Sequence, residues 1–479
     1  MKPTIKPIAM AGALLLSACS MAPTYERPAA PVADAYAFNP SGIAAKTGFD
    51  THLPGPGQKN ATDTGWREYF TDQHLQQLIA AALENNRDLR TAVLRIEEAR
   101  AQYNIQSADR LPNVNASVAD TRAKTPAFLS SSGRSTIGER YDVGVSVSAF
   151  ELDFFGRVKS LNDAALASYL ATEEARSAAQ IALVSQVAQA YYTERAYAEQ
   201  HALAVQTYEA RTRTYKLTQQ RAEVGASSRL DLRSNETLME TARASALALA
   251  RQRAQAENAL TLLVGQAPAT AASGAMPGDL QINFMTAIPT GLPSDLLIRR
   301  PDIRAAEQRL KAANANIGAA RAAFFPRISL TAAVGSSSPA LHDLFDSGSG
   351  SWSFAPQLTL PIFDAGRNRA NLTLAEVRKN LAVADYEKTI QTAFREVADA
   401  LAARDYLGEQ EAAQRAVQEA QADRLKLLQL RFDNGVASSL DVLDAQRELF
   451  SAQQALVQAR LLRTTSAIDL YRTLGGGVR

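Results

Sequence analysis

Residues 88–112 read DLRTAVLRIEEARAQYNIQSADRLP, and residues 302–326 read DIRAAEQRLKAANANIGAARAAFFP. The two stretches align without a gap at a constant offset of 214 residues, and each ends in proline. Further along the chain the offset becomes 210, and it then matches Gly225 to Gly435. The chain is therefore an internal duplication, and we expect each half to build the same set of elements.

The matched spacing predicts two very long helices. From Arg157 to Gly225 is 68 residues, and from Arg367 to Gly435 is again 68. Neither span contains proline, and Gly408 is the only glycine before the final one. At about 1.5 Å per residue, each span can form one unbroken helix of roughly 100 Å. Helices of this length are typical of a conduit across a compartment rather than of a globular domain.

Short turns follow the two long helices. Each turn places glycine where a helix C-cap favours positive φ, and then a serine, Ser228 or Ser438, where the next N-cap favours a hydroxyl. We therefore expect helical hairpins over 157–265 and 367–474. Their apolar positions are small and spread around the helix axis, which indicates neighbours on both sides rather than a two-stranded coiled coil.

After the proline that ends each quoted stretch, the apolar period changes from about 3.6 residues to about 2. This alternation predicts strand pairs at 113–152 and 327–362, with surface loops at 123–140 and 336–351. Strands of about ten residues with one apolar face are typical of membrane β-strands. Beyond the N-terminus no stretch reads as a membrane-spanning helix. Four strands do not close a barrel and lipid does not tolerate an open edge, so three copies would supply twelve strands.

The N-terminus has the pattern of an export signal. A basic start, a short apolar run over 8–16 and small residues before Cys19 predict a signal peptide at 1–18. The apolar run is too short to span a bilayer. Residues 16–19 (LSAC) resemble a bacterial lipobox, in which the cysteine thiol becomes a thioether to diacylglycerol, and Cys19 is the only cysteine of the chain. The alternative is an ordinary buried thiol.

The rest of the chain divides at Trp66, where helical periodicity begins. Residues 19–65 are rich in Pro, Gly and Ala and carry no period, so we interpret them as a lipidated, extended tether. The first structural repeat then covers 66–290, with short helices before its strand pair and hairpin, and the second covers 291–479. Without the signal peptide the chain has 49 basic and 49 acidic residues. This balance gives no support for nucleic acid as a partner, because such proteins carry a basic surface.

The sequence gives no support for catalysis. Neither a phosphate-binding loop nor a nucleophile motif is present, and the histidines do not pair at metal-ligand spacing. The carboxylates stand mostly among Lys and Arg at helical spacing, which is typical of a solvated helix face. We therefore predict no enzyme activity, no metal site and no cofactor.

Several short motifs are spread over nearly the whole mature chain. They are YERP at 25–28, ELDFFGR at 151–157, RRPDIRAAE at 299–307, AANANIGAAR at 312–321, LPIFDAGR at 360–367 and LDVLDAQR at 440–447. In these motifs the chain resembles the outer-membrane efflux lipoproteins of the NodT type, within the TolC superfamily. This resemblance implies an α+β, TolC-like fold, in which a homotrimeric twelve-strand transmembrane β-barrel, with four strands per chain, continues into a long periplasmic α-helical barrel.

The resemblance implies the outer-membrane channel of a tripartite efflux system. Such a channel is a passive exit duct for small molecules, delivered through a periplasmic adaptor by an inner-membrane pump, commonly of the resistance-nodulation-division class. It also implies a trimer in the cell outer membrane, anchored in lipid through Cys19 and extending into the periplasm. Ser20 follows the cysteine, and in this the chain resembles lipoproteins that are sorted to the outer membrane. Two alternatives are a type I secretion duct, which the lipobox disfavours, and a structural coiled-coil lipoprotein, which the alternating strands disfavour.

The resemblance also assigns a periplasmic gate to the second hairpin. In the channels that this chain resembles, an Asp at the position of Asp444 forms a ring at the closed periplasmic mouth, and the apolar residue at the position of Leu440 narrows the same mouth. In TolC itself, Asp441 also has a matching gate carboxylate. The alternative for Asp441 is a favourable charge at the start of a helix. Phe432 and Ala437 stand where TolC carries a Tyr and an Arg that lock the tips, which favours closure by apolar and carboxylate groups alone.

The turns of both hairpins are the expected docking site for the adaptor. In the first hairpin Asp231 matches Asp441, but Ser234 stands at the position of Asp444, so only the second hairpin carries both acids. The expected docking residues are Val224, Gly225, Ala226 and Ser227 in the first turn and Asn434, Gly435, Val436 and Ala437 in the second.

Overall fold

The computed structural model describes residues 20–33, 64–131, 133–266 and 299–476. Cys19, the signal peptide and most of the expected tether lie outside these residues. The chain divides into two compact units, and each of them contains segments from both halves of the duplication. The first unit contains the described residues up to 29 together with 95–173 and 305–387, and the second contains the others.

The long helices predicted from the spacing are confirmed. Helices α5 and α9 are each 67 residues long and unbroken, and each is followed by a shorter helix that completes a hairpin. The helices are α2 (Trp66–Tyr69), α3 (Gln73–Asn85), α4 (Arg87–Ala108), α5 (Arg157–Glu223), α6 (Arg229–Val264), α8 (Pro301–Ala322), α9 (Arg367–Asp433) and α10 (Ser439–Thr473). Among the described helices, none has both the length and the hydropathy required to cross a bilayer.

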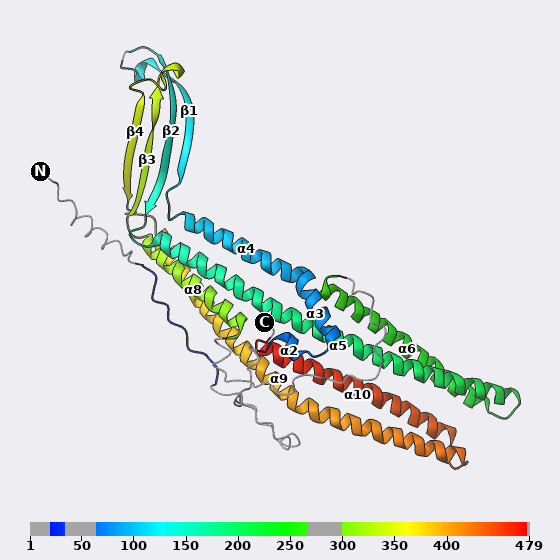
Figure 1. Ribbon diagram of the computed structural model, residues 1–479. Coiled ribbons are helices and arrows are strands. Elements are labelled where there is room, and N and C mark those ends of the chain that lie inside the picture. Colours follow the sequence, from blue (N-terminus) through cyan, green and yellow to red (C-terminus); the bar gives the residue numbers. More distant parts are fainter. Residues whose placement is uncertain (1–19, 34–63, 132, 267–298, 477–479) are drawn as a thin grey trace. The chain divides into compact units, whose positions relative to one another are not determined.

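Four antiparallel strands form one sheet in the order β1-β2-β3-β4, and the pairing of β2 with β3 joins the two halves of the duplication (Figure 1). One row of the sheet pairs Ala116 with Val145, Val145 with Val334, and Val334 with Trp352, so an apolar face continues across all four strands. In the described part of the chain no other strand pairs with the outer edges of β1 and β4. The strands are β1 (Val114–Thr125), β2 (Thr136–Leu152), β3 (Arg327–Ser338) and β4 (Gly350–Thr359).

The strands extend further than the sequence pattern predicted. The loop expected at 123–140 is wrong at both ends, because β1 and β2 stay in register as far as the pair Thr125 and Thr136. Likewise, β3 and β4 enter the loop expected at 336–351. Backbone hydrogen bonds continue the ladder without apolar side chains, and an ion pair of 2.9 Å between Arg122 and Glu139 links the two strands where the alternation has ended.

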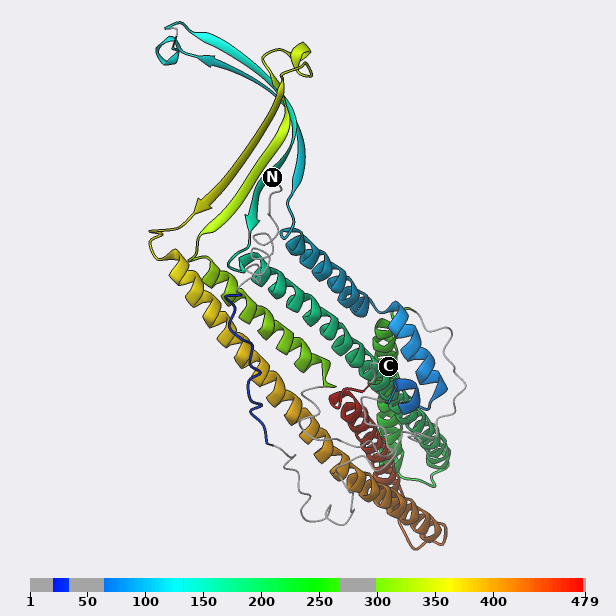
Figure 2. The ribbon, with the colours of Figure 1, turned by 60° about the vertical axis from the view of Figure 1, so that its left-hand side comes forward.

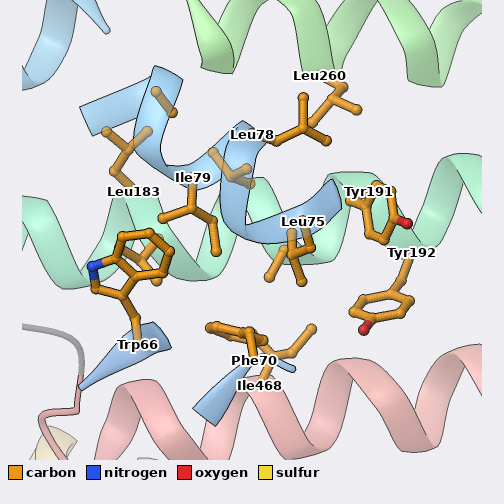
Figure 3. Packing of buried hydrophobic residues seen from close by; sticks show 14 of the residues in the cluster. Trp66, Phe70, Leu75, Leu78, Ile79, Leu183, Tyr191, Tyr192, Leu260 and Ile468 are labelled. Atoms are coloured by element: carbon orange, nitrogen blue, oxygen red, sulfur yellow. The ribbon is translucent and has the colours of Figure 1, made fainter. Parts of the chain in front are cut away.

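The core of the second unit gathers α2, α3, α5, α6 and α10 around a cluster of large side chains (Figure 3). The helical period expected after Trp66 is confirmed in α3, since Leu75, Leu78 and Ile79 all point into this cluster. In the same cluster the rings of Tyr69 and Tyr471 stack with centroids 4.1 Å apart. These contacts fix the inner ends of the hairpins, while their turns lie together at the other end of the unit (Figures 1 and 2).

The two duplicated helices, α4 and α8, differ in burial. In α8 the apolar positions are covered, and Ile303, Leu310 and Ile317 are almost fully buried. In α4 only Leu89 is buried, and Val93, one turn further along, is exposed. The duplication therefore gives the same helix twice but a different environment for each copy.

Candidate functional site at the hairpin turns

Both hairpin turns use the same backbone device. Gly225 and Gly435 have φ values of +75° and +73°, a region that costs other residues roughly 1 kcal/mol or more. The amide N–H that follows each glycine donates five residues back, from Ala226 to the Arg221 carbonyl at 2.7 Å and from Val436 to the Arg431 carbonyl at 2.8 Å. These bonds form Schellman caps, which satisfy carbonyls left open at the helix ends. The predicted glycine C-caps are therefore confirmed.

Each second helix begins with a capping box. Ser438 Oγ accepts from the Asp441 N–H at 3.2 Å, and the Ser438 N–H donates to the Asp441 carboxylate at 3.0 Å. Ser228 and Asp231 form the same pair in the first hairpin. Hydrogen bonds from the Ser438 side chain and backbone hold the pKa of Asp441 below its ordinary value. Within one chain Asp441 therefore has the contacts of a residue that caps the start of a helix, which is the alternative given for it above.

Asp444 lies one turn further along α10 and is an ion-pair acceptor. Its Oδ1 is 2.5 Å from Arg447 Nη2 on the same helix, and its Oδ2 is 3.3 Å from Arg424 Nη2 on α9. Two guanidinium groups therefore contact this carboxylate within one chain, and closure by apolar and carboxylate groups alone stays a prediction. The side chains of Asp444 and Arg424 are 37% and 46% exposed, so solvent screens the pair.

A further arginine lies close to this cluster. Arg211 of α5 is buried, and its Nη1 donates to the Leu238 carbonyl of α6 at 3.0 Å. Burial, and then the nearby charge of Arg447, lower the pKa of Arg211. The site therefore combines one carboxylate on α10 with guanidinium groups from three helices.

The turns also expose apolar side chains. Leu440 is 71% exposed beside Asp444, and Leu230 is 76% exposed at the matching position of the first hairpin. All eight residues expected to dock the adaptor lie at the surface, with Ser227 and Ala437 partly covered and the other six exposed. Among the described residues, no group of three or more His, Cys, Asp and Glu side chains is arranged to hold a metal ion.

Sequence reasoning missed Arg424, Arg447 and Arg211. Arg447 follows Asp444 by three residues, a spacing that places both side chains on one face of a helix and that would have revealed the pair. Arg424 stands 20 residues before Asp444, and only the antiparallel packing of the hairpin brings the two together. Arg211 reaches the site from the other half of the duplication, which no local pattern predicts.

Comparison with known proteins identifies the family. The model of the family described as "Outer membrane efflux protein" matches residues 78–266 and 292–476. Outer membrane protein OprJ of Pseudomonas aeruginosa is 51% identical over 477 residues, which cover 99% of this chain and 96% of OprJ. The toluene efflux pump outer membrane protein TtgC of Pseudomonas putida is 48% identical over 465 residues, which cover 97% of this chain and 94% of TtgC.

Solved structures give the same result. The crystal structure of the open state of the MtrE outer membrane channel of Neisseria gonorrhoeae is 41% identical and has a TM-score of 0.85, covering 96% of this chain and 99% of the MtrE chain. The predicted TolC-like fold class is confirmed, and the four-stranded sheet is consistent with one chain of a trimeric barrel. The chain therefore belongs to the outer membrane efflux protein family and is the outer-membrane channel component of a tripartite efflux system.

Proposed function

We propose that the channel closes where the α9–α10 turns of three chains converge, and that Asp444, Arg424 and Leu440 hold it closed. The observation that carries this proposal is the contact of 3.3 Å between Arg424 and Asp444, which joins α9 to α10 close to their turn. It is the ion pair nearest to that turn among those that link the two helices within the described residues. Opening moves the start of α10 away from α9 and breaks this contact.

Two guanidinium groups offset the negative charge of each Asp444. Three bare carboxylates in a narrow mouth would repel one another, because like charges in a partly desolvated site raise the energy steeply. The guanidinium groups of Arg447 and Arg424 reduce that repulsion by contacting each Asp444. Leu440 then supplies an apolar constriction, the kind of narrowing that closes pores by excluding water.

Planar-bilayer recordings test the gate. We expect Asp444→Ala to raise the resting conductance, and a further Leu440→Ala substitution to raise it more. The matched control is Asp231→Ala in the first hairpin, where no second acid follows, and its effect should be smaller. Equal resting conductance in the wild type and in Asp444→Ala would contradict a role of Asp444 in the gate and would leave it as a charge near the start of a helix.

We also propose that the hairpin turns dock a periplasmic adaptor, which connects the channel to an inner-membrane pump of the resistance-nodulation-division class. Val224 and Val436 are 79% and 66% exposed at the turns, and exposed apolar residues in a group are typical of partner surfaces. Co-purification after cross-linking in membranes should lose the adaptor in Val436→Asp. The control is Leu262→Asp, which places the same charge at an exposed leucine of α6 away from the turns. Loss in both variants, or in neither, would contradict docking at the turns.

The cargo that we propose is small molecules, including apolar ones, rather than secreted proteins. The relative TtgC is named for toluene efflux, and its similarity covers nearly the whole of this chain. A strain that lacks the channel should regain growth in toluene when this chain is supplied with its pump and adaptor. Restored secretion of a protein substrate without restored solvent tolerance would favour the type I alternative.

Lipid attachment at Cys19 completes the proposal. The lipobox at 16–19 supports it, as does the absence of any other cysteine from the chain. Two or more acyl chains anchor a protein stably, whereas one holds it weakly. Metabolic palmitate label should enter the wild type and be absent from Cys19→Ala, and label retained in that variant would reject the anchor.

A further inference from the structure

One carboxylate lies between two guanidinium groups at the base of the sheet, where β2 ends and β3 begins beside the start of α5 (Figure 1). The side chain of Glu151, near the end of β2, is only 9% exposed, and its two oxygens accept from Arg157 Nε and Nη2, both at 2.7 Å. Arg327, the first residue of β3, places its Nε 2.7 Å from the same carboxylate. The three side chains therefore carry one excess positive charge per chain.

A β-bulge determines which face of the sheet Glu151 occupies. The pairing of β2 with β3 shifts register between residues 147 and 150, where Ala149 has a φ of +48°. Before the shift the odd-numbered residues of β2 lie on the apolar face, whereas after it the odd-numbered Glu151 lies opposite Ser329, on the polar face. Arg327 is two residues from Ser329 on β3 and shares that face, because side chains alternate along a strand. The bulge thus turns Glu151 to the polar side, a common role of bulges.

Elsewhere on the polar face the charges cancel or are missing. Towards the far end of the sheet Arg140 and Asp142 form an ion pair of 2.9 Å. Among the described residues of β1 and β4, the positions on this face hold no charge. Between the ion pair and the base, the same face of β2 and β3 holds small uncharged residues, among them Gly144, Ser146, Ser329, Thr331, Ala333 and Gly335. The excess positive charge of this face therefore lies at its base.

The polar face lines the lumen when three chains close the barrel, because the apolar face meets lipid. β3 pairs with β2 on one side and with β4 on the other, so neighbouring chains join the sheet at its outer strands rather than at β3. The side chain of Arg327 is 58% exposed, and this exposed part faces the lumen. Three chains place three such guanidinium groups at one level of the duct.

The charged pair is not part of the duplicated pattern. Asn113 stands in the first half at the position of Arg327, with the offset of 214, and Pro361 stands in the second half at the position of Glu151, with the offset of 210. Each half therefore supplies one member of the pair, and the ring that three chains form has one Arg327 per chain.

A cavity of about 310 Å³ adjoins these side chains, and the guanidinium groups of Arg157, Arg327 and Arg367 all line it. Two aspartates also line it, but each accepts a backbone N–H at the start of a helix. Asp153 accepts from the Lys159 N–H at 2.7 Å, and Asp364 accepts from the Asn368 N–H at 2.8 Å. Among the described residues only Glu151 forms ion pairs with the guanidinium groups of this cavity. Such an excess of guanidinium groups favours an anionic ligand.

We propose that Arg327 is a selectivity residue of the duct, and that its three copies form a positively charged ring at the base of the barrel that attracts the anionic groups of transported molecules. Glu151 is a positioning residue, because it holds Arg327 at the lumen side. Rings of Arg or Lys are the arrangement by which pores favour anions. This inference rests on the exit-duct function and on closure of the barrel by three chains, and it does not depend on the proposed gate at the hairpin turns.

Reversal potentials across a salt gradient in planar bilayers test the ring. They are measured near about 10 mM salt, where the Debye length of about 30 Å lets fixed charges act across a lumen. The ratio of anion to cation permeability should fall at least about threefold in Arg327→Gln and further in Arg327→Glu, and it should stay at the wild-type value in Arg327→Lys. Glu151→Gln should raise the ratio, because it removes a negative charge beside the ring.

The matched control is Arg122→Gln. Arg122 is 68% exposed and lies 2.9 Å from Glu139 on the neighbouring strand, but it belongs to the apolar face of the same sheet. Its substitution should leave the permeability ratio unchanged. A shift in Arg122→Gln as large as that in Arg327→Gln, or a loss in Arg327→Lys as large as in Arg327→Gln, would overturn the ring.

Binding of hexacyanoferrate(II), an anion with four negative charges, gives a second readout that needs no open pore. Calorimetry on the purified protein, with each variant first shown by mass to keep the wild-type assembly, should find binding at least about tenfold weaker in Arg327→Glu and unchanged in Arg122→Gln. Equal binding and equal permeability ratios in the wild type and in Arg327→Glu would refute the proposal. A wild type that binds the anion but never conducts would instead contradict the duct, so the two failures are distinguishable.

Discussion

The ion pair between Arg424 and Asp444 makes a quantitative prediction about gating. If opening breaks this contact, Arg424→Ala and Asp444→Ala remove the same interaction, and the double variant should add little to the larger single effect. The two side chains are 46% and 37% exposed, and pairs screened to this degree contribute about 0.2–1 kcal/mol. Three copies give roughly 0.6–3 kcal/mol, which corresponds to a rise in resting open probability of about 3- to 140-fold.

The assay is a double-mutant cycle on open probability in planar bilayers at low and high salt. The expected coupling is the full pair contribution, and it should shrink at high salt because exposed charges are screened. A matched control is the cycle on Arg233 and Glu236, an ion pair of 2.5 Å within α6 that opening leaves intact. Purely additive effects at Arg424 and Asp444, or equal coupling in the control cycle, would refute this account of closure.

Two further predictions follow from the turns and the sheet. The Ser438 hydrogen bonds lower the pKa of Asp441 in the folded chain. The stability that this capping box contributes is therefore present above the ordinary pKa of about 3.9 and is lost as the pH falls through the lower folded value. Amide exchange at the start of α10 should accelerate only in that acidic range and should not do so in Asp441→Asn, whereas acceleration near neutral pH would contradict this prediction. Within the described residues no strand pairs with the outer edges of β1 and β4, and lipid does not satisfy open backbone groups. The protein extracted in detergent should therefore have the mass of a trimer, and a folded monomer with full β content would reject the shared barrel.

Much of the fold was readable from the sequence because its signals are local. The lengths of α5 and α9 follow from the absence of proline and from the glycines that end each span. The starts of α6 and α10 follow from serines whose side chains bond their own neighbours. The strand ends did not follow, because alternation records only which side chains are covered. The ladder between Thr125 and Thr136 depends on backbone groups that every residue carries.

The sequence by itself determined the duplication, the element order and the family, since each rests on periodicity, helix-ending residues or short motifs. Only the tertiary structure decided which charges meet. Asp444 was selected from a motif, but its contact with Arg424 requires the antiparallel return of the hairpin. Glu307 belongs to another motif, and its partner Arg27 is 280 residues away. A buried carboxylate must be compensated by a cation, but the chain supplies 51 of them, and packing alone determines which one lies within hydrogen-bonding distance.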